Sequence, residues 1–144
     1  MINKKILGVD YGDARTGLAL SDISGFLASG AGCIKSTGFL KTAESVSEIA
    51  KKNDVGLIVL GHPINMNGTL GPRSEKVQAF GKHLEEITGI TVELFDERLS
   101  TSNAHTILNI TNTRGAKRKE IIDAMSASLI LQSYLDRERG KKNG

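Results

Sequence analysis

The chain alternates between short apolar runs and longer segments in which apolar residues recur at helical spacing. A short apolar run bounded by Gly, Pro or polar residues is typical of a strand, whereas apolar residues at i, i+3 and i+4 indicate a helix. These patterns predict strands over 6–10, 16–21, 26–34, 56–61 and 91–95, and helices over 40–52, 73–86 and 119–139. Ser100 or Thr101 can cap a further helix that ends near Ile110, and a polar, basic loop is expected over 111–118.

The order of these elements predicts the fold class. The first two strands are joined by a short linker, which favours an antiparallel hairpin, and strands then alternate with helices, which favours parallel pairing. We therefore predict an α/β fold whose mixed sheet has three antiparallel strands followed by two parallel strands, with helices on both faces. We expect a single domain over 1–139 and a disordered basic tail over 140–144.

Composition narrows the class of protein. The 144 residues are 39% hydrophobic and 24% charged, which is typical of a globular chain. Cys33 is the only cysteine, so the sequence predicts neither an intrachain disulfide nor a cysteine-based zinc site. No apolar stretch is long enough to cross a bilayer, and Asp10 follows the N-terminus too closely for a signal peptide. We therefore expect a soluble, cytoplasmic protein without a membrane partner.

The positive charge is concentrated near the C-terminus. The formal net charge is +3; residues 111–144 carry eight basic and four acidic side chains, and the rest of the chain carries eleven and twelve. Lys117, Arg118 and Lys119 form a compact cluster. Such a cluster releases counterions from phosphates and so indicates a nucleic-acid contact, but a solubilising loop has the same composition. Charge alone leaves both interpretations open.

At three places along the chain, acidic residues stand where apolar residues are expected. Asp10 ends an apolar strand, Asp96 and Glu97 end another, and Asp123 shares a helical stripe with Ala127, Ile130 and Tyr134. The carboxyl ends of the parallel strands meet at one edge of a sheet, so Asp10 and Glu97 are expected there. Carboxylates that converge from separate elements repel one another and bind a hard divalent cation. Mg²⁺ or Mn²⁺ suits such a site, and two ions ~4 Å apart can promote phosphodiester hydrolysis.

Each acid also has a purely structural interpretation. Asp10 can accept backbone N–H groups in a turn, Asp123 can be a favourable acid at a helix N-terminus, and Glu97 can pair with Arg98 or Arg15. For a single acid the structural interpretation is the more common one. The predicted convergence of all three on one edge favours the metal site.

Basic and polar residues flank the same predicted edge. Arg15, Arg73 and Arg98 can each hold a phosphate through a bidentate guanidinium, or can instead pair with nearby acids. The loop over 65–71 offers backbone N–H groups, but it matches neither a Walker A pattern nor a G-x-G-x-x-G fingerprint, so its signal as a phosphate-binding loop is weak. His62 can act as a general base, although a lone histidine after a strand is more often structural.

Four motifs, in order and at matching spacing, resemble one known family. They are Gly8-Val9-Asp10-Tyr11-Gly12-Asp13-Ala14-Arg15-Thr16-Gly17-Leu18-Ala19, Gly68-Thr69-Leu70-Gly71-Pro72-Arg73, Asp96-Glu97-Arg98-Leu99-Ser100-Thr101, and Ile122-Asp123-Ala124 with the segment over 130–136. Over nearly its whole length the chain resembles the YqgF family, also called RuvX or pre-16S rRNA nuclease, whose fold is RNase H-like and related to that of RuvC.

The resemblance implies a metal-dependent nuclease with Asp10, Glu97 and Asp123 as metal ligands. It implies maturation of the 5′ end of the small-subunit ribosomal RNA precursor, with structured RNA and a ribosomal particle as partners. Cleavage of branched DNA junctions is the alternative by analogy with RuvC, and a resolvase is expected to act as a symmetric dimer. Fold analogy alone does not choose between these substrates, nor between a monomer and a homodimer.

Two other classes of protein compete with the nuclease. A non-catalytic RNA-binding assembly factor would use the basic cluster over 117–119 without turnover. An actin-like ATPase fragment also begins with an Asp-x-Gly motif before a hairpin, but those proteins need two such domains to close around a nucleotide. The 144 residues supply only one, which argues against the ATPase.

Overall fold

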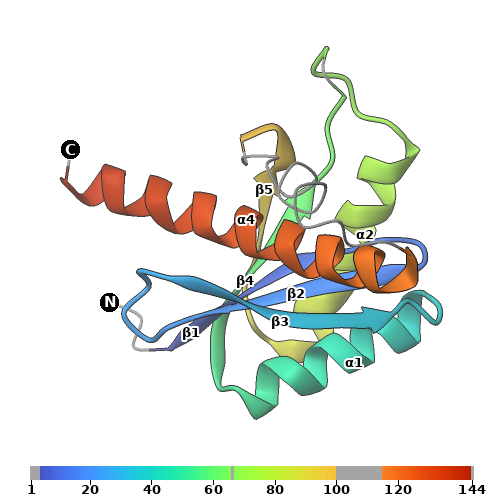
Figure 1. Ribbon diagram of the computed structural model, residues 1–144, viewed down its shortest axis with the longest axis horizontal. Helices are drawn as coiled ribbons and strands as arrows, with labels where there is room; N and C mark the ends of the chain where they lie inside the picture. Colours follow the sequence, from blue (N-terminus) through green and yellow to red (C-terminus); the bar gives the residue numbers. More distant parts are fainter. Residues whose placement is uncertain (1–3, 66, 100–114, 144) are drawn as a thin grey trace.

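Within the part of the chain that the structure describes, five strands form one mixed sheet and three helices cover it (Figure 1). The computed structural model describes residues 4–65, 67–99 and 115–143, with side chains described over 4–65, 67–99 and 125–140. The elements in chain order are β1 (Lys5–Asp10), β2 (Arg15–Ser21), β3 (Ala28–Lys35), α1 (Phe39–Lys52), β4 (Val55–His62), α2 (Pro72–Thr88), β5 (Val92–Asp96), the 3-10 turn η1 (Glu97–Leu99) and α4 (Gly115–Asn143). The helix expected from Ser100 or Thr101 to Ile110 lies outside the described residues.

The sheet has the strand order β3-β2-β1-β4-β5, and its directions confirm the predicted fold class. β1 pairs antiparallel with β2, and β2 pairs antiparallel with β3. β1 pairs parallel with β4, and β4 pairs parallel with β5. The register sets Val9 beside Leu60 and Gly61 beside Phe95, so the carboxyl ends of β1, β4 and β5 share one edge.

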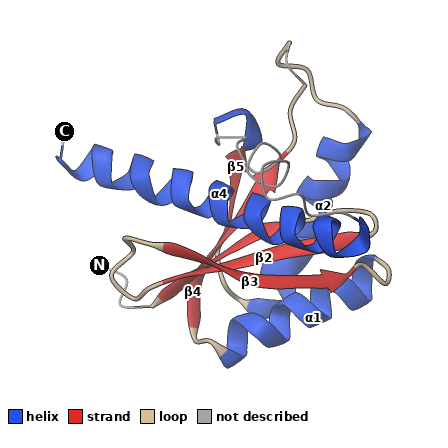
Figure 2. Cartoon of the chain, viewed as in Figure 1, coloured by secondary structure: helices blue, strands red, loops and turns tan. Residues whose placement is uncertain are grey.

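The helices form a layer on each face of the sheet, as Figure 2 shows by element type. On one face, α1 and α2 pack against alternate strand residues such as Leu7, Val9 and Leu60 to form the larger core. On the other face, α4 packs through a smaller core. Its buried members are Ala19, Leu57, Val59, Phe95, Ala127, Ile130, Leu131, Tyr134 and Leu135. Because successive strand residues face opposite sides, Asp10 and Glu97 belong to the face that α4 covers.

Helix α4 lies unusually close to β1. A Cβ built on Gly8 would stand 2.8 Å from Cβ of Leu131 and 3.2 Å from the backbone oxygen of Ala127. A real Cβ does not approach a neighbour to 2.8 Å, so only glycine permits this distance between helix and strand. Gly8 therefore sets how α4 docks on the sheet.

Two helix ends test the sequence predictions. Gly89 follows α2 with φ of 70°, and its backbone N–H donates to the carbonyl of Glu85, so this glycine ends the helix two residues beyond the predicted end at Glu86. Helix α4 begins at Gly115 and ends at Asn143, so 115–118 are helical where a loop was predicted, and the helix passes its predicted end at Arg139. Ala, Lys, Arg and Glu are strong helix formers, so the polar composition of these segments does not imply a loop.

In the part of the chain that the structure describes, none of the helices combines the length and the apolar character that a membrane span requires.

The close contact at Gly8 predicts a loss of stability in Gly8→Ala. The added Cβ must push α4 away from β1, which we expect to cost about 1–3 kcal/mol in the free energy of unfolding measured by urea denaturation. Gly140→Ala, a change in α4 itself, is the matched control, because nothing lies within 4 Å of a Cβ built at that position. Equal stability of the Gly8→Ala variant and wild type would contradict the docking role of Gly8.

Candidate active site

Asp10 and Glu97 meet at the edge where β1 and β5 end. Asp10 is the last residue of β1, and Glu97 is the first residue of η1, immediately after β5. Both side chains are partly buried and form a hydrogen bond with each other. A hydrogen bond between two carboxyl groups requires a proton on one of them, so the pair carries fewer than two negative charges.

The environment raises the pKa of both acids. Burial raises the pKa of Glu97 to about 7, and repulsion by the Asp10 carboxylate acts in the same direction. Burial also raises the pKa of Asp10, while the hydrogen bond from Glu97 and the charge of Arg73 oppose that shift. The pair therefore holds a proton more strongly than two separate exposed carboxyl groups would.

Gly61 makes the space in which Glu97 reaches Asp10. A Cβ built on Gly61 would lie 2.7 Å from Oε1 of Glu97 and 2.7 Å from Cδ1 of Ile130. The absent side chain thus leaves room for the carboxylate of Glu97 and a methyl group of Ile130 from α4. Sequence reasoning missed this residue; its only signal was a glycine at the end of a buried strand.

The direction of α4 places its N-terminal turns at the same edge. The Tyr134 hydroxyl donates to Glu93 at 2.8 Å, Ile130 lies against Gly61, and Ala127 lies against Gly8, so residue numbers in α4 fall toward the edge. Asp123 precedes Ala127 by one helical turn, about 6 Å, and Asp10 follows Gly8 by about the same length of strand. The backbone of Asp123 therefore approaches the level of Asp10.

The side chain of Asp123 lies outside the described side chains, and so do those of Lys117, Arg118 and Lys119. Their roles stay predictions. Among the side chains that the structure describes, no group of three or more His, Cys, Asp or Glu residues is arranged to hold a metal ion. Two of the three predicted ligands, Asp10 and Glu97, are together.

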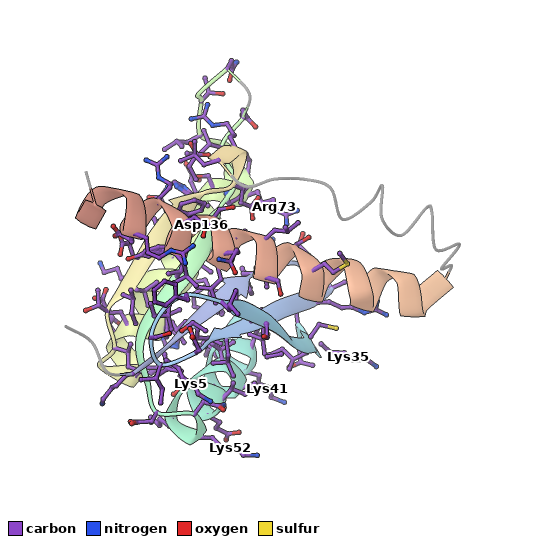
Figure 3. All side chains as sticks on the ribbon, turned by 60° about the vertical axis from the view of Figure 1, so that its left-hand side comes forward. Lys5, Lys35, Lys41, Lys52, Arg73 and Asp136 are labelled. Atoms are coloured by element: carbon purple, nitrogen blue, oxygen red, sulfur yellow. The ribbon has the colours of Figure 1, made fainter. Side chains whose placement is uncertain are left out.

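Arg73 provides positive charge beside the carboxylates. It is the second residue of α2, follows Pro72, and has an exposed side chain. Its charge lowers the pKa of both Asp10 and Glu97, which places its guanidinium within electrostatic range of the pair. Figure 3 shows Arg73 at the end of the sheet opposite to Lys5, where β1 starts. Arg73 thus combines proximity to the site with access to solvent.

Asp96 does not join the carboxyl pair, because it points to the other face of the sheet. Arg98 holds Asp96 through its side chain, with an Nη2 to Oδ2 distance of 2.8 Å, and through its backbone N–H at 2.9 Å. These hydrogen bonds keep the pKa of Asp96 below its usual value. Arg98 also donates to the carbonyl oxygen of Asn65 at 3.5 Å, so its guanidinium links η1 to the loop before α2.

Arg15 is half-buried at the start of β2, directly after the turn that follows Asp10. The turn requires glycine, because a Cβ on Gly12 would lie 2.5 Å from the carbonyl oxygen of Arg15. Lys76 of α2 forms a salt bridge with Asp13 in the same turn at 3.2 Å. The turn and α2 therefore flank the site together.

The loop from β4 to α2 projects beyond the sheet in Figure 2 and is braced by its own hydrogen bonds. The backbone N–H of Asn65 donates to Thr69, and that of Gly68 donates to Asn65, with Gly68 at φ of 85°. His62, where the loop begins, faces α2 and contacts the Ser74 hydroxyl at 2.6 Å. This contact matches the structural interpretation of His62 rather than a general base beside the carboxylates.

The mixed sheet with a helix layer on each face is an RNase H-like fold, and the family to which the chain belongs is one of nucleases. A family model described as "RuvX: Holliday junction resolvase" matches residues 4–137, and the chain belongs to that family. A Ruminiclostridium cellulolyticum protein named "Putative pre-16S rRNA nuclease" is 48% identical over 139 residues, 96% of this chain and 98% of the relative. A Clostridioides difficile protein of the same name is 46% identical over 136 residues, 94% of this chain and 96% of the relative.

Solved structures with the same fold include two resolvases. Thermus thermophilus RuvC in complex with a Holliday junction matches with a TM-score of 0.60 at 11% identity, over 94% of this chain and 96% of that chain. The yeast mitochondrial Holliday junction resolvase matches with a TM-score of 0.58 at 8% identity, over 98% of this chain and 82% of that chain. Identities this low establish a shared fold and nothing about substrate.

The raised pKa of Glu97 predicts a pH-dependent stability difference between wild type and Glu97→Gln. Below pH 4.5, the ordinary pKa of a glutamate, Glu97 is protonated in both the folded and the unfolded chain. Above about pH 7 it is ionised in both, and the folded state then contains a partly buried carboxylate beside Asp10, which destabilises it. Wild type therefore loses stability from this group as pH rises through that window. In EDTA at pH 8 we expect the unfolding midpoint of Glu97→Gln to lie roughly 3–8 °C above that of wild type. At pH 4 we expect the two proteins to have the same midpoint.

Differential scanning calorimetry measures both values. Glu86→Gln, a change at an exposed acid on α2, is the control and should show no such dependence on pH. An equal difference between wild type and Glu97→Gln at both pH values would contradict the assigned environment of Glu97.

Proposed function

We propose that this chain is a metal-dependent nuclease that hydrolyses phosphodiester bonds of structured nucleic acid, with precursor ribosomal RNA as its substrate. The observation that carries the proposal is the pair of partly buried, hydrogen-bonded carboxyl groups of Asp10 and Glu97. Two such groups at one edge of the sheet are costly for folding, because burial raises the pKa of both and the Asp10 carboxylate repels that of Glu97. A cost of this kind persists at sites where it serves a function.

The donor set suits a hard divalent cation. Both ligands are carboxylate oxygens, which Mg²⁺ and Mn²⁺ prefer, and a cation between them takes the place of the shared proton. Asp10, Glu97 and, from α4, Asp123 would hold the metal, and we propose two ions. When bound, such ions activate water and stabilise the departing oxygen of a phosphodiester.

The protein's own residues would position the nucleic acid around that centre. Arg73 offers an exposed guanidinium whose fork matches a phosphate, and its charge acts on both carboxyl groups. Arg15 begins β2 directly after the turn that follows Asp10. We assign Lys117, Arg118 and Lys119 to backbone contacts farther along the substrate, where they act through charge rather than sequence. Arg98 contributes indirectly, through the loop that it holds by Asn65.

Precursor RNA is favoured over DNA by the relatives that share 42–48% of residues with this chain, all named for the 16S ribosomal RNA precursor. Processing at the 5′ end of that precursor, on a ribosomal particle, is the specific role that we propose. Cleavage of a four-way DNA junction is the second candidate, supported by the fold shared with RuvC bound to such a junction. That support concerns the fold alone and is therefore weaker.

The first test is cleavage by Asp10→Asn. We expect the variant to lose at least about 10²-fold in cleavage rate on precursor 16S rRNA with Mg²⁺ or Mn²⁺, because it removes a negative ligand, while the fold remains. Asp13→Asn, a change in the adjacent turn, is the matched control and should cut normally. A four-way DNA junction assayed in parallel separates the two substrates.

Cleavage by Asp10→Asn at the wild-type rate would contradict the metal assignment. Salt-sensitive RNA binding that persists in EDTA, with no cleavage by wild type under any metal, would instead identify a non-catalytic RNA-binding factor.

Metal binding is the second test and needs no substrate. Titration calorimetry with Mn²⁺ at pH 8 should show affinity falling about 10-fold or more in Glu97→Gln and in Asp123→Asn, because each removes a carboxylate ligand. Glu86→Gln is the control and should bind as wild type does. Unchanged affinity in Asp123→Asn would remove Asp123 from the site and leave a two-carboxylate centre.

A further inference from the structure

The first turn of α2 lacks the usual cap. Gly71 is its N-cap residue, so no side chain accepts a hydrogen bond from the free N–H groups of the turn, and Pro72 follows. A Gly-Pro start preceded by an exposed loop would leave the orientation of this turn poorly determined. Ser74, only 1% exposed, anchors it instead, through a 2.6 Å contact between its hydroxyl and Nε2 of His62.

Ser74 lies between two side chains, one from β4 and one from its own helix. The side-chain amide of Gln78 donates to the Ser74 hydroxyl at 3.1 Å and also faces Nε2 of His62 at 3.4 Å. The same hydroxyl shares a hydrogen bond of 2.6 Å with Nε2 of His62. The ring nitrogen at the end of β4 thereby holds the first turn of α2.

His62 and Ser74 connect the two elements that meet at the active site. His62 is the last residue of β4 and follows Gly61, whose missing side chain accommodates Glu97. Ser74 follows Arg73, the residue whose charge acts on both carboxyl groups. The contact thus joins the strand that makes room for Glu97 to the helical turn that carries Arg73.

We propose that His62 is a positioning residue, which acts through Ser74 to hold the first turn of α2 so that Arg73 faces the carboxyl pair and a substrate phosphate. The inference rests on the proposed function for its substrate, but the contact itself is testable without one. His62 does not touch the reacting atoms; its effect on the substrate passes through Arg73. This role explains why the hydroxyl of a fully buried serine and an amide converge on one ring nitrogen.

Hydrogen exchange measured by NMR tests the local part of the proposal in the free protein. In His62→Ala, the amides of Glu75, Lys76 and Val77 should exchange at least about threefold faster, because the turn loses its anchor. His62→Gln should restore slow exchange, since its side-chain oxygen can accept from Ser74. His83→Ala removes a histidine farther along the same helix and is the matched control. Unchanged exchange in His62→Ala would overturn the proposal.

RNA binding in EDTA tests the functional part. We expect Arg73→Ala to weaken binding of precursor 16S rRNA about tenfold and His62→Ala about threefold to fivefold, because a charge-assisted contact is lost or misplaced. In the Arg73→Ala background, His62→Ala should weaken binding no further, which a merely structural role would not produce. Equal weakening by His62→Ala with and without Arg73 would overturn the proposal.

Failure of the proposed function gives a different result. If wild type neither binds nor cuts precursor RNA or a DNA junction, then the nuclease assignment is wrong. The binding part of the present proposal is overturned with it, whereas the exchange rates still decide whether His62 anchors α2.

Discussion

The hydrogen bond between the carboxyl groups of Asp10 and Glu97 is the interaction on which the rest of the site depends. Two acids at this distance cannot both ionise without repulsion, and burial adds to the cost, so the pair retains a proton or takes a cation. The fold keeps them together because Asp10 ends β1 and Glu97 directly follows β5, and the carboxyl ends of these strands share one edge. A shift of one residue in the pairing register of either strand would turn its acid to the opposite face.

Two glycines in the strands link the position of the carboxyl pair to the position of helix α4. Gly8 lets α4 approach β1, and Gly61 leaves the space that Glu97 and Ile130 share. Both glycines lie on the α4 face, in neighbouring strands. The packing of α4 on these two positions therefore sets both the distance between the helix and the sheet and the space in which the Glu97 carboxylate lies. The close docking of α4 also determines how near Asp123 comes to Asp10.

The opposite face of the same edge holds a separate polar network. Asp96 is bound by Arg98, and His62 by Ser74, so the two residues that are neighbours in the strand register anchor η1 and α2 respectively. One face therefore brings two carboxyl groups together, while on the other face Arg98 neutralises the carboxylate of Asp96. This division explains how adjacent residues, Asp96 and Glu97, have pKa values shifted in opposite directions. Resolvases at 8–11% identity share the fold, so backbone architecture tolerates nearly complete replacement of the side chains.

Local patterns in the sequence determined the five strands, their mixed directions, the stop of α2 at Gly89 and the pairing of Asp10 with Glu97, because periodicity and strand direction fix which residues share an edge. The start of α4 was wrong, since helix propensity outweighed a polar composition. Only the tertiary structure decided the roles of Gly8 and Gly61, the pairing of Arg98 with Asp96, and the contact of His62 with Ser74. Those features depend on distances between elements far apart in the chain, which no local pattern encodes.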